Sequence, residues 1–513
     1  MMNFSEFSHV EILSELAVVQ QRSDEWGEQV SGKGESYDIH CIVYDGRHLV
    51  LDIQNSFLLA VDDEAKRSLE KTKVSGHDVI TNKINEKSGN SLQGACHEIN
   101  YLRECGLFPP ATQDNPKVLI DNFSVGILPI IKMTLILSYH CNLSCRYCYL
   151  DQYGYTGTAS PHMPWEVAKK AIDYLFDKSI GSNTIIIEYF GGEPFLNREV
   201  LYRSIEYSNQ KAKQVNKRLE TVIVTNGTLF DTDTAEFLNQ FNTTLLVSID
   251  GPVDIHDQYR RKKVGGGSLQ EILLRISHIT KVFRKSLVAC PTFTSASLGN
   301  LDRIVDFLYD AGFRGIFGNT SRLPVGEPGH MSDDDYRDLV EEYLALAPKV
   351  YKRSPRLYFY LEGIYNHIRS LFYGAIFPQS CTSFNGTSTF VVVPEGRMYP
   401  CLALINCDRF FMGQIPDEDR CRQIRKIFYN NTASSNQHLS CRQCWARFLC
   451  GGKCPVFFLE NRDFISSTAC RTLNLGCNLE RFRINKSMEL AYNIYRDGSS
   501  SLRDFVNFSK REQ

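Results

Sequence analysis

Apolar positions follow two different periods in the middle of the chain. From residue 131 to residue 330, short apolar runs recur, and each is followed by a stretch with apolar residues at helical spacing. The first run is 133–139, "MTLILSY", and the last is 314–320, "RGIFGNT". Near-continuous apolar strands are typical of a parallel sheet covered on both faces. About six strand–helix units in succession predict an α/β barrel or part of one.

The front of the chain has a different pattern. Residues 37–61 contain three β-rich runs, and an Asp-Gly pair at Asp45 and Gly46 predicts a hairpin between the first two. Residues 63–71 and 94–108 have helical spacing, and a Pro-rich linker follows at 108–116. We therefore expect a small, separate α+β domain here.

These patterns divide the chain into five parts. We expect an N-terminal α+β domain, a barrel, a helical bridge, a cysteine-rich domain and a C-terminal tail, at residues 1–115, 131–330, 331–380, 381–485 and 486–513.

Composition excludes several classes of protein. The chain has 513 residues, with 57 basic and 59 acidic side chains, so its charge gives no reason to expect nucleic-acid binding. Hydrophobic residues make up 43%, as in globular proteins. The first twenty residues lack the pattern of a signal peptide, and no apolar run is long enough to cross a membrane. We expect a cytoplasmic protein without membrane or nucleic-acid partners.

Cysteines are numerous and unevenly spread. Three of the 17 lie between 141 and 148, and ten lie between 381 and 477. Disulfides are rare in the cytoplasm, so such close groups indicate metal sites. The isolated thiols, which we interpret as buried packing residues, are Cys41, Cys96, Cys105 and Cys290.

The first group has the spacing CX3CX2C. Four thiolates would close a structural zinc site, whereas three leave one coordination position open. Iron–sulfur clusters are also held by cysteine thiolates, normally four. The segments "GGEP", "TNGT" and "SIDGP" each follow a predicted strand end. Barrel enzymes have their sites at the carboxyl ends of the strands, so we expect these segments to share one site with the cysteines.

Taken together, these motifs resemble the signature of the radical S-adenosylmethionine superfamily. The resemblance covers residues 131 to about 480. It implies a partial (β/α)6 TIM-like barrel, a 4Fe–4S cluster held by Cys141, Cys145 and Cys148, and S-adenosylmethionine bound to the open iron. One electron would cleave the cofactor to a 5′-deoxyadenosyl radical. The residues implied in cofactor binding are Tyr147, Gly191, Gly192, Glu193, Thr225, Asn226, Ser248, Asp250 and Arg260.

The second group of cysteines resembles the SPASM extension, which holds two auxiliary 4Fe–4S clusters in radical enzymes that act on peptides and proteins. A zinc ribbon is the alternative for paired cysteines of this kind. By the family's usual pattern, one auxiliary cluster would be bound by Cys441, Cys444, Cys450 and Cys470. The other would be bound by Cys381, Cys401 and Cys454.

The chain departs from the sulfatase-maturing members of the family at this second auxiliary cluster. Those members have a further cysteine soon after the first, whereas the corresponding stretch here, "TSFNGTS", has none. The fourth ligand could be Cys407, Cys421 or Cys477, or a thiolate of the substrate, because an open iron binds soft ligands.

The resemblance implies a radical peptide or protein maturase, an oxidoreductase that installs a thioether or carbon–carbon cross-link. Its partners would be a precursor peptide and an electron donor such as flavodoxin or ferredoxin. The N-terminal domain loosely resembles the domain that binds leader peptides along a sheet edge. An anaerobic sulfatase maturase and a zinc-bound scaffold without catalysis are the alternatives. Strand alternation also places Glu188 on the face of Ile186 and Phe190, where it could act as a base or hydrogen-bond the cofactor.

Overall fold

The structure of the chain is a computed structural model. It describes residues 8, 10–12, 39–53, 56–71, 95, 97–99, 102, 129–148, 161–321, 323, 325–353, 357–361, 363–373, 386, 388–415, 417–430, 444–450 and 477–496.

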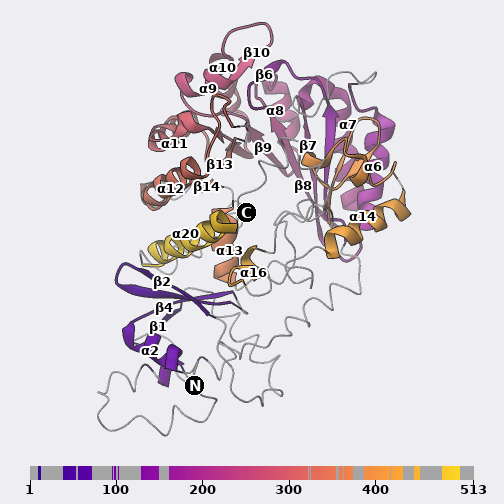
Figure 1. Cartoon of the computed structure of the whole chain (residues 1–513). Coiled ribbons are helices and arrows are strands. Elements are labelled where there is room, and N and C mark those ends of the chain that lie inside the picture. Colours follow the sequence, from indigo (N-terminus) through magenta and orange to yellow (C-terminus); the bar gives the residue numbers. More distant parts are fainter. Residues whose placement is uncertain are drawn as a thin grey trace, which may run out of the picture.

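A large, mainly parallel sheet forms the centre of the molecule (Figure 1). The six strands predicted for the barrel are present and pair in parallel: β5 (Lys132–Ser138), β7 (Thr184–Gly191), β8 (Arg218–Thr225), β9 (Thr243–Val247), β11 (Ser286–Ala289) and β13 (Gly315–Thr320). A short strand, β12 (Thr292–Phe293), follows β11 beyond Pro291 and also pairs with β13. The prediction of an α/β fold with a parallel sheet is confirmed.

Two further parallel strands extend this sheet at its edges. β14 (Tyr358–Leu361), from the expected helical bridge, pairs with β13. β15 (Thr389–Val392), from the expected cysteine-rich domain, pairs with β5 and then turns back as β16 (Met398–Tyr399). The sheet therefore joins segments that the sequence assigned to three different domains.

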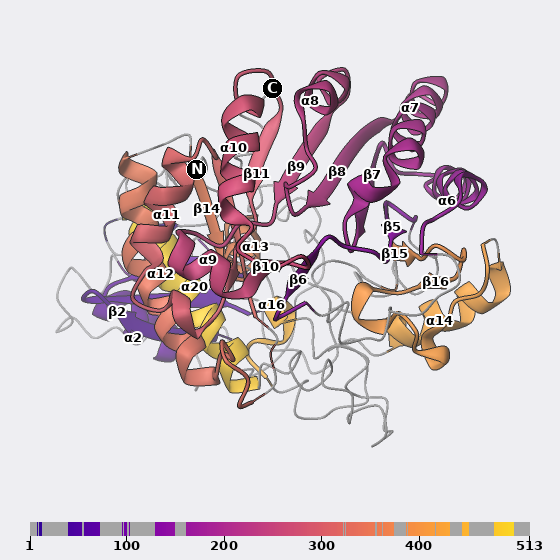
Figure 2. The ribbon, with the colours of Figure 1, turned by 90° about the horizontal axis from the view of Figure 1, so that it is seen from above.

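Helices cover the outer face of the sheet (Figure 2). They follow the strands in the alternation that the sequence predicted: α6 (Trp165–Lys178), α7 (Arg198–Gln214), α8 (Thr232–Leu238), α10 (Leu269–Ile279) and α11 (Leu301–Asp310). Their apolar faces pack on one side of the strands. Ile185, Ile187 and Tyr189 of β7, for example, are at most 1% exposed and belong to the main core.

The opposite face of the strands is only partly covered. On β7, β8 and β9, residues alternate between buried and half-buried, and the half-buried ones point away from the helices. We call this side the lumen face; it carries Ile186, Glu188, Phe190, Val222, Val224, Thr244 and Leu246. The side chains of the lumen face are therefore partly exposed on the inner side of the sheet.

The N-terminal sheet consists of β1 (Val10–Ile12), β2 (Ile39–Tyr44), β3 (Arg47–Asp52) and β4 (Phe57–Val61) in the order β1-β4-β3-β2. The sequence predicted the last three of these strands. Asp45 and Gly46 both have positive φ, 48° and 73°, as the tight hairpin between β2 and β3 requires. α2 (Asp63–Lys71) follows β4, and residues 95, 97–99 and 102 are helical, as predicted.

Both faces of β3 and β4 in the N-terminal sheet are buried. Leu49 and Leu51 of β3 face the main core, whereas Val50 belongs to a second core with residues of α2 and of the helical positions near residue 99. The N-terminal part and the barrel therefore share a continuous apolar core.

Three helices complete the C-terminal side: α12 (Asp333–Arg353), α13 (Ile364–Tyr373) and α20 (Cys477–Arg496). α20 runs without a break through the boundary expected at 485/486, because its apolar side packs into the main core up to Ile494. At the start of α20, Glu480 accepts hydrogen bonds from His367 of α13 (2.9 Å) and from Arg483 (3.0 Å). None of the helices in the described part of the chain is long and apolar enough to span a membrane.

Candidate active site

The CX3CX2C segment, residues 141–148, follows β5 directly and is called here the cluster loop. Its strand β6 (Leu143–Cys145) pairs antiparallel with β10 (Arg260–Lys262), so that Cys145 lies opposite Arg260. The backbone N–H of Arg146 donates to Tyr259 (3.0 Å), and that of Lys263 donates to Asn142 (3.1 Å), which lengthens the pairing at both ends. The cluster loop is therefore held by the segment that contains Arg260.

The three thiols lie near one another in a poorly solvated setting. Burial raises the pKa of Cys141 to about 11 and that of Cys145 to about 12, and the neighbouring thiols add to both shifts. Cys141 Sγ accepts hydrogen bonds from Leu143 N (3.4 Å) and Asn226 Nδ2 (3.6 Å). Amide donors of this kind stabilise cluster thiolates and set the reduction potential. The donor set therefore fits an iron–sulfur cluster, whose charge would offset the cost of burying thiolates.

Single-metal binding is not evident in the same region. No three His, Cys, Asp or Glu side chains of the described residues converge as ligands of one metal ion. In a cubane, each thiolate binds a different iron, so the sulfurs need not converge.

Gly191 and Gly192 bring two strand ends into close contact. A Cβ at Gly191 would collide with the carbonyl oxygen of Ser138, and one at Gly192 with that of His140. Gly192 N donates to Ser138 O and Glu193 N donates to His140 O, both at 2.8 Å. Glycine is required here because the loop packs on the backbone that leads into Cys141.

Glu193 ties the end of β7 to the end of β8. Its fully buried carboxylate accepts hydrogen bonds from Thr225 Oγ1 (2.8 Å), Asn226 N (2.8 Å) and Phe195 N (3.1 Å). Burial raises its pKa to about 7, although the three donors oppose this shift. A carboxylate has about four acceptor positions, and the described donors occupy three of them.

Asn226 connects the end of β8 to the cluster loop. Its Nδ2 donates to Asn142 Oδ1 (2.8 Å) as well as to Cys141 Sγ. Its Oδ1 accepts from Thr228 N (3.0 Å) and Thr228 Oγ1 (2.6 Å). The side chain therefore holds the first cysteine in place, whatever further contact it makes with a ligand.

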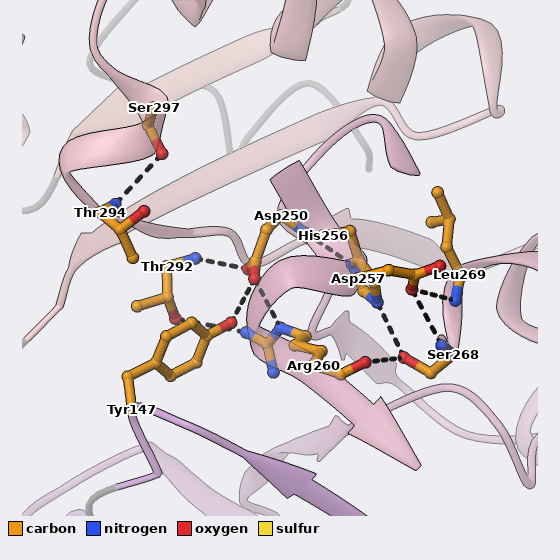
Figure 3. Close-up of polar contacts among 10 residues, drawn as sticks. All are labelled: Tyr147, Asp250, His256, Asp257, Arg260, Ser268, Leu269, Thr292, Thr294 and Ser297. Atoms are coloured by element: carbon orange, nitrogen blue, oxygen red, sulfur yellow. Dashed lines mark hydrogen bonds and ion pairs between the residues drawn. The ribbon is translucent and has the colours of Figure 1, made fainter. Parts of the chain in front are cut away.

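Asp250, at the end of β9, organises the other side of the site (Figure 3). Its Oδ2 accepts from the Tyr147 hydroxyl and from Arg260 Nε (3.0 Å), and its Oδ1 accepts from Thr292 N (2.9 Å). The Arg260 guanidinium also lies over the Tyr147 ring, 5.2 Å from its centroid, and the Tyr259 ring stacks on Tyr147 at 5.6 Å. Tyr147, the aromatic residue of the motif, therefore anchors the cluster loop to the strand ends.

A second chain of hydrogen bonds links Asp250 to Arg260 through the backbone (Figure 3). Asp250 N donates to His256 Nδ1 (3.2 Å), so the proton of the neutral imidazole is on Nε2, which donates to Ser268 Oγ (2.9 Å). Ser268 Oγ in turn donates to the carbonyl of Arg260 (2.7 Å). Burial lowers the pKa of His256 to about 4, which keeps the ring neutral. Motif spacing did not predict a role for His256 or Ser268, because their relation depends on how the chain turns after α9 (Val253–Tyr259).

Few polar atoms at the strand ends stay available for a ligand. The half-buried hydroxyl of Ser248 and the Nη1 of Arg260 make no hydrogen bond with any described residue. Arg260 Nη2 is 3.3 Å from Thr292 Oγ1. The site thus offers two donors.

Glu188 lies on the lumen face with Ile186 and Phe190, as strand alternation predicted. Its carboxylate forms an ion pair with Lys132 Nζ (2.9 Å) and accepts a hydrogen bond from Thr134 Oγ1 (2.7 Å). Both partners lie on β5. A catalytic role for Glu188 remains a prediction.

Two of the isolated cysteines lie within the described residues, and both are half-buried. Cys41 packs against the second core. Cys290 follows β11, and its Sγ accepts a hydrogen bond from Asn319 Nδ2 (3.3 Å). Cys96 and Cys105 lie outside the described residues.

The predicted auxiliary-cluster ligands are only partly covered by the structure. Cys401, Cys444 and Cys450 are half-buried at the margin of the main core, and Arg481 Nη2 lies 3.6 Å from Cys444 Sγ. Cys381, Cys441, Cys454 and Cys470 lie outside the described residues. We call Cys407, Cys421 and Cys477 the spare cysteines. Of these, Cys421 is 2% exposed and accepts a hydrogen bond from the Tyr174 hydroxyl of α6 (3.6 Å).

The parallel half-open barrel, with its three-cysteine loop at the carboxyl ends of the strands, is the architecture of a radical S-adenosylmethionine domain. Residues 135–308 match the Radical SAM superfamily, so this part of the chain is a radical SAM domain, which uses S-adenosylmethionine and a 4Fe–4S cluster.

The chain is similar to several known proteins. A cysteine-type anaerobic sulfatase-maturating enzyme of Clostridium perfringens is 23% identical over 330 residues, which are 61% of this chain and 85% of the relative. An uncharacterised protein of Methanocaldococcus jannaschii is 30% identical over 184 residues, which are 36% of this chain and 60% of that protein. The radical SAM cyclopropyl synthase TigE of Paramaledivibacter caminithermalis is 26% identical over 132 residues, 24% of this chain and 27% of TigE.

Two solved structures share the fold. Native anSMEcpe with bound AdoMet and Kp18Cys peptide superimposes with a TM-score of 0.57 at 18% identity, over 71% of this chain and 99% of that one. Streptococcus suis SuiB bound to S-adenosylmethionine superimposes with a TM-score of 0.50 at 16% identity, over 84% of this chain and 97% of SuiB.

Proposed function

We propose that this protein modifies a ribosomally made peptide or protein by forming a thioether or carbon–carbon cross-link. The observation that carries the proposal is the N-terminal sheet, which shares the main core with the barrel and has β2 at one edge of its described strands. Edge strands bind extended peptides by adding them to the sheet. A peptide bound there would be delivered to a barrel whose lumen face is half-open.

The comparisons support a peptide partner. The anSMEcpe structure contains a peptide, and the SuiB structure covers a larger share of this chain than anSMEcpe does, 84% against 71%. The chain also lacks the additional cysteine after Cys381 that the sulfatase-maturing members have.

The residues of the site have distinct roles in this proposal. Cys141, Cys145 and Cys148 would bind three irons of the cluster and leave the fourth open for S-adenosylmethionine. When bound, these cofactors supply a 5′-deoxyadenosyl radical that removes hydrogen from the substrate. Arg260 Nη1 would pair with the cofactor's carboxylate, and the remaining acceptor position of Glu193 with its ammonium.

Two auxiliary clusters would complete the enzyme. Cys441, Cys444, Cys450 and Cys470 would bind one of them. Cys381, Cys401 and Cys454 would bind the other, with its fourth position open to a substrate thiolate.

Sulfatase maturation is the second candidate function. It is favoured by the sequence match to the Clostridium perfringens enzyme, which extends over 85% of that enzyme's length. In that case the product would be formylglycine.

Mass spectrometry of the product separates these functions. The protein would be purified without oxygen, reduced with dithionite and supplied with S-adenosylmethionine and synthetic cysteine-containing peptides. Loss of two hydrogen atoms from a peptide supports cross-linking, whereas replacement of the cysteine sulfur by an aldehyde oxygen supports formylglycine. Iron analysis is the control: about twelve irons per chain fit three cubanes, and zinc without iron would contradict both enzymes.

A further inference from the structure

We propose that the outer face of the β6–β10 ribbon is the docking surface for an acidic one-electron donor protein. The inference rests on the proposed function, because it needs a cluster held by Cys141, Cys145 and Cys148. It concerns where the electron enters, which neither the fold nor the comparisons assign.

The ribbon has two faces of different character. In an antiparallel pair, residues opposite one another share a face, and successive residues alternate between the faces. Cys145 and Arg260, which lie opposite each other, face inward, and Arg260 is only 7% exposed. Arg261, opposite Ser144, therefore faces outward.

Two more basic residues lie at the two ends of the ribbon. Arg146 continues β6 opposite Tyr259, and Lys263 continues β10 opposite Asn142, as their backbone hydrogen bonds show. The side chains of Arg146, Arg261 and Lys263 are all exposed. Three exposed cations therefore lie along the ribbon that carries a predicted cluster ligand.

Within the described part of the chain, these three cations have no acidic partner. Arg146, Arg261 and Lys263 form no ion pair with any described residue, whereas Lys262, which faces inward, has its Nζ 3.7 Å from a carboxylate oxygen of Glu271. The whole chain carries a formal charge of −2, so this positive face is a local feature and not a result of overall charge.

The surface around the ribbon is accessible. Figure 1 shows β10 and the loop behind it at the margin of the molecule, at the top of the view. Val264, at the start of that loop, is 93% exposed and adds an apolar contact beside the cations. Basic side chains around one exposed apolar residue match a partner with an acidic rim.

The outer face lies close enough to the predicted cluster for electron transfer. A partner packed on a β-layer lies about 10 Å from it, so a donor on the outer face would stand one thin layer from the cluster. A flavodoxin in its hydroquinone form would lose one electron and the cluster would gain it, with no bond made or broken. Opposite charges would speed the encounter of the two proteins.

The test compares a protein donor with a small reductant in the holoenzyme. The double variant R261E/K263E would be mixed with an acidic flavodoxin hydroquinone, and oxidation of the flavin would be followed by stopped-flow absorbance. We expect the second-order rate to fall about tenfold or more at low salt. The difference should vanish near 1 M salt, where the Debye length is about 3 Å. With dithionite, cleavage of S-adenosylmethionine should match that of the unmodified protein.

Two further variants are controls for the size and the position of the charge change. R261Q/K263Q, which removes the charges without reversing them, should give a smaller loss in the same direction. K281E/K285E changes the net charge equally at two exposed positions near the amino end of β11, and should leave the flavodoxin rate unchanged. Equal rates for R261E/K263E and the unmodified protein would overturn the proposal, and so would an equal loss in K281E/K285E. Absence of the cluster from the unmodified protein would instead contradict the proposed function.

Discussion

His40 of the N-terminal sheet stacks face to face on Trp445 of the C-terminal segment, with ring centroids 3.5 Å apart and an interplanar angle of 2°. His40 Nε2 also lies 2.9 Å from Asn485 Oδ1 of α20, and burial lowers the pKa of the imidazole. Because Trp445 directly follows Cys444, the sheet that we propose for peptide binding touches a segment that carries a predicted cluster ligand.

We expect this stack to contribute measurably to stability. His40→Ala should lower the free energy of unfolding by about 1 kcal/mol, because a stacked pair of rings is worth that much beyond its buried area. In a double-mutant cycle with Trp445→Phe, urea unfolding should give a coupling energy of similar size. Val43→Ala, on the same strand at a position 71% exposed, is the control and should have almost no effect. Additive effects of the two substitutions would show that the rings do not interact.

Removal of the three thiols of the cluster loop should abolish one cluster and leave the auxiliary clusters in place. The triple variant C141A/C145A/C148A should lose all cleavage of S-adenosylmethionine, because no other described thiol lies on this loop. It should keep about eight of twelve irons, since the auxiliary ligands are remote in sequence. The measurements are 5′-deoxyadenosine by chromatography and iron per chain. Continued production of 5′-deoxyadenosine would contradict the assignment of these cysteines as cluster ligands.

Asp250→Asn should destabilise the protein strongly. The substitution leaves the buried guanidinium of Arg260 without its counter-charge, which typically costs about 3–5 kcal/mol. Asp254→Asn is the matched control, because Asp254 pairs with Arg303 at the surface, where both side chains are at least half exposed. Such a pair is worth about 1 kcal/mol or less. Thermal unfolding of the two variants gives the comparison, and similar losses would contradict the role given to Asp250.

The ion cluster at Glu480 predicts a dependence of stability on pH. Arg483 and His367 outweigh the effect of burial and lower the pKa of Glu480 to about 2, from an ordinary value of 4.5. A lowered carboxyl pKa stabilises the fold above the unfolded-state pKa, and this contribution is lost as the pH falls from about 5 towards 2. At pH 7 it is about 3 kcal/mol at most. Urea unfolding of Glu480→Gln at pH 7 and pH 4 tests this, and the deficit relative to the unmodified protein should be smaller at pH 4.

The spare cysteines make a further prediction about the auxiliary cluster. Cys421→Ala should leave the cluster spectra unchanged, because Cys421 is buried against Tyr174 of α6. Cys407 lies six positions after Cys401 and is half-buried, so Cys407→Ala is the informative variant. If the substrate supplies the fourth ligand, Cys407→Ala leaves the spectrum unchanged and a cysteine-containing peptide changes it. The same peptide with Ala in place of Cys is the control. A spectrum indifferent to the peptide's thiol would exclude substrate ligation.

Local patterns in the sequence were sufficient to predict much of this fold. The strands β5, β7, β8 and β9 each contain a short apolar run, and the Asp45–Gly46 turn has the residues that positive φ requires. By contrast, β14 and β15 are four residues long, and they belong to the barrel only because they pair with strands far away in the chain. No local periodicity carries that information.

The site was predictable to a similar degree. Motif spacing located the cluster loop, Glu193 and Arg260 at neighbouring strand ends. It did not reveal that donors from other residues of the protein occupy most acceptor positions of Glu193 and Asp250. Nor did it reveal the link from His256 through Ser268, because hydrogen-bond partners depend on the turns that bring them together.

The pairing of β15 with β5 limits how this protein can be cut or recombined. The first cysteine of the cluster loop lies three residues after β5, whose outer edge is covered by a strand that begins more than 250 positions later, at Thr389. A gene fragment ending before Thr389 would expose the backbone of β5 along that edge, where it could pair with other chains. The C-terminal cysteine segment is therefore not an appendage that can be exchanged between enzymes as a unit. A chimaera would have to carry β15 and β5 together, and with them the start of the cluster loop.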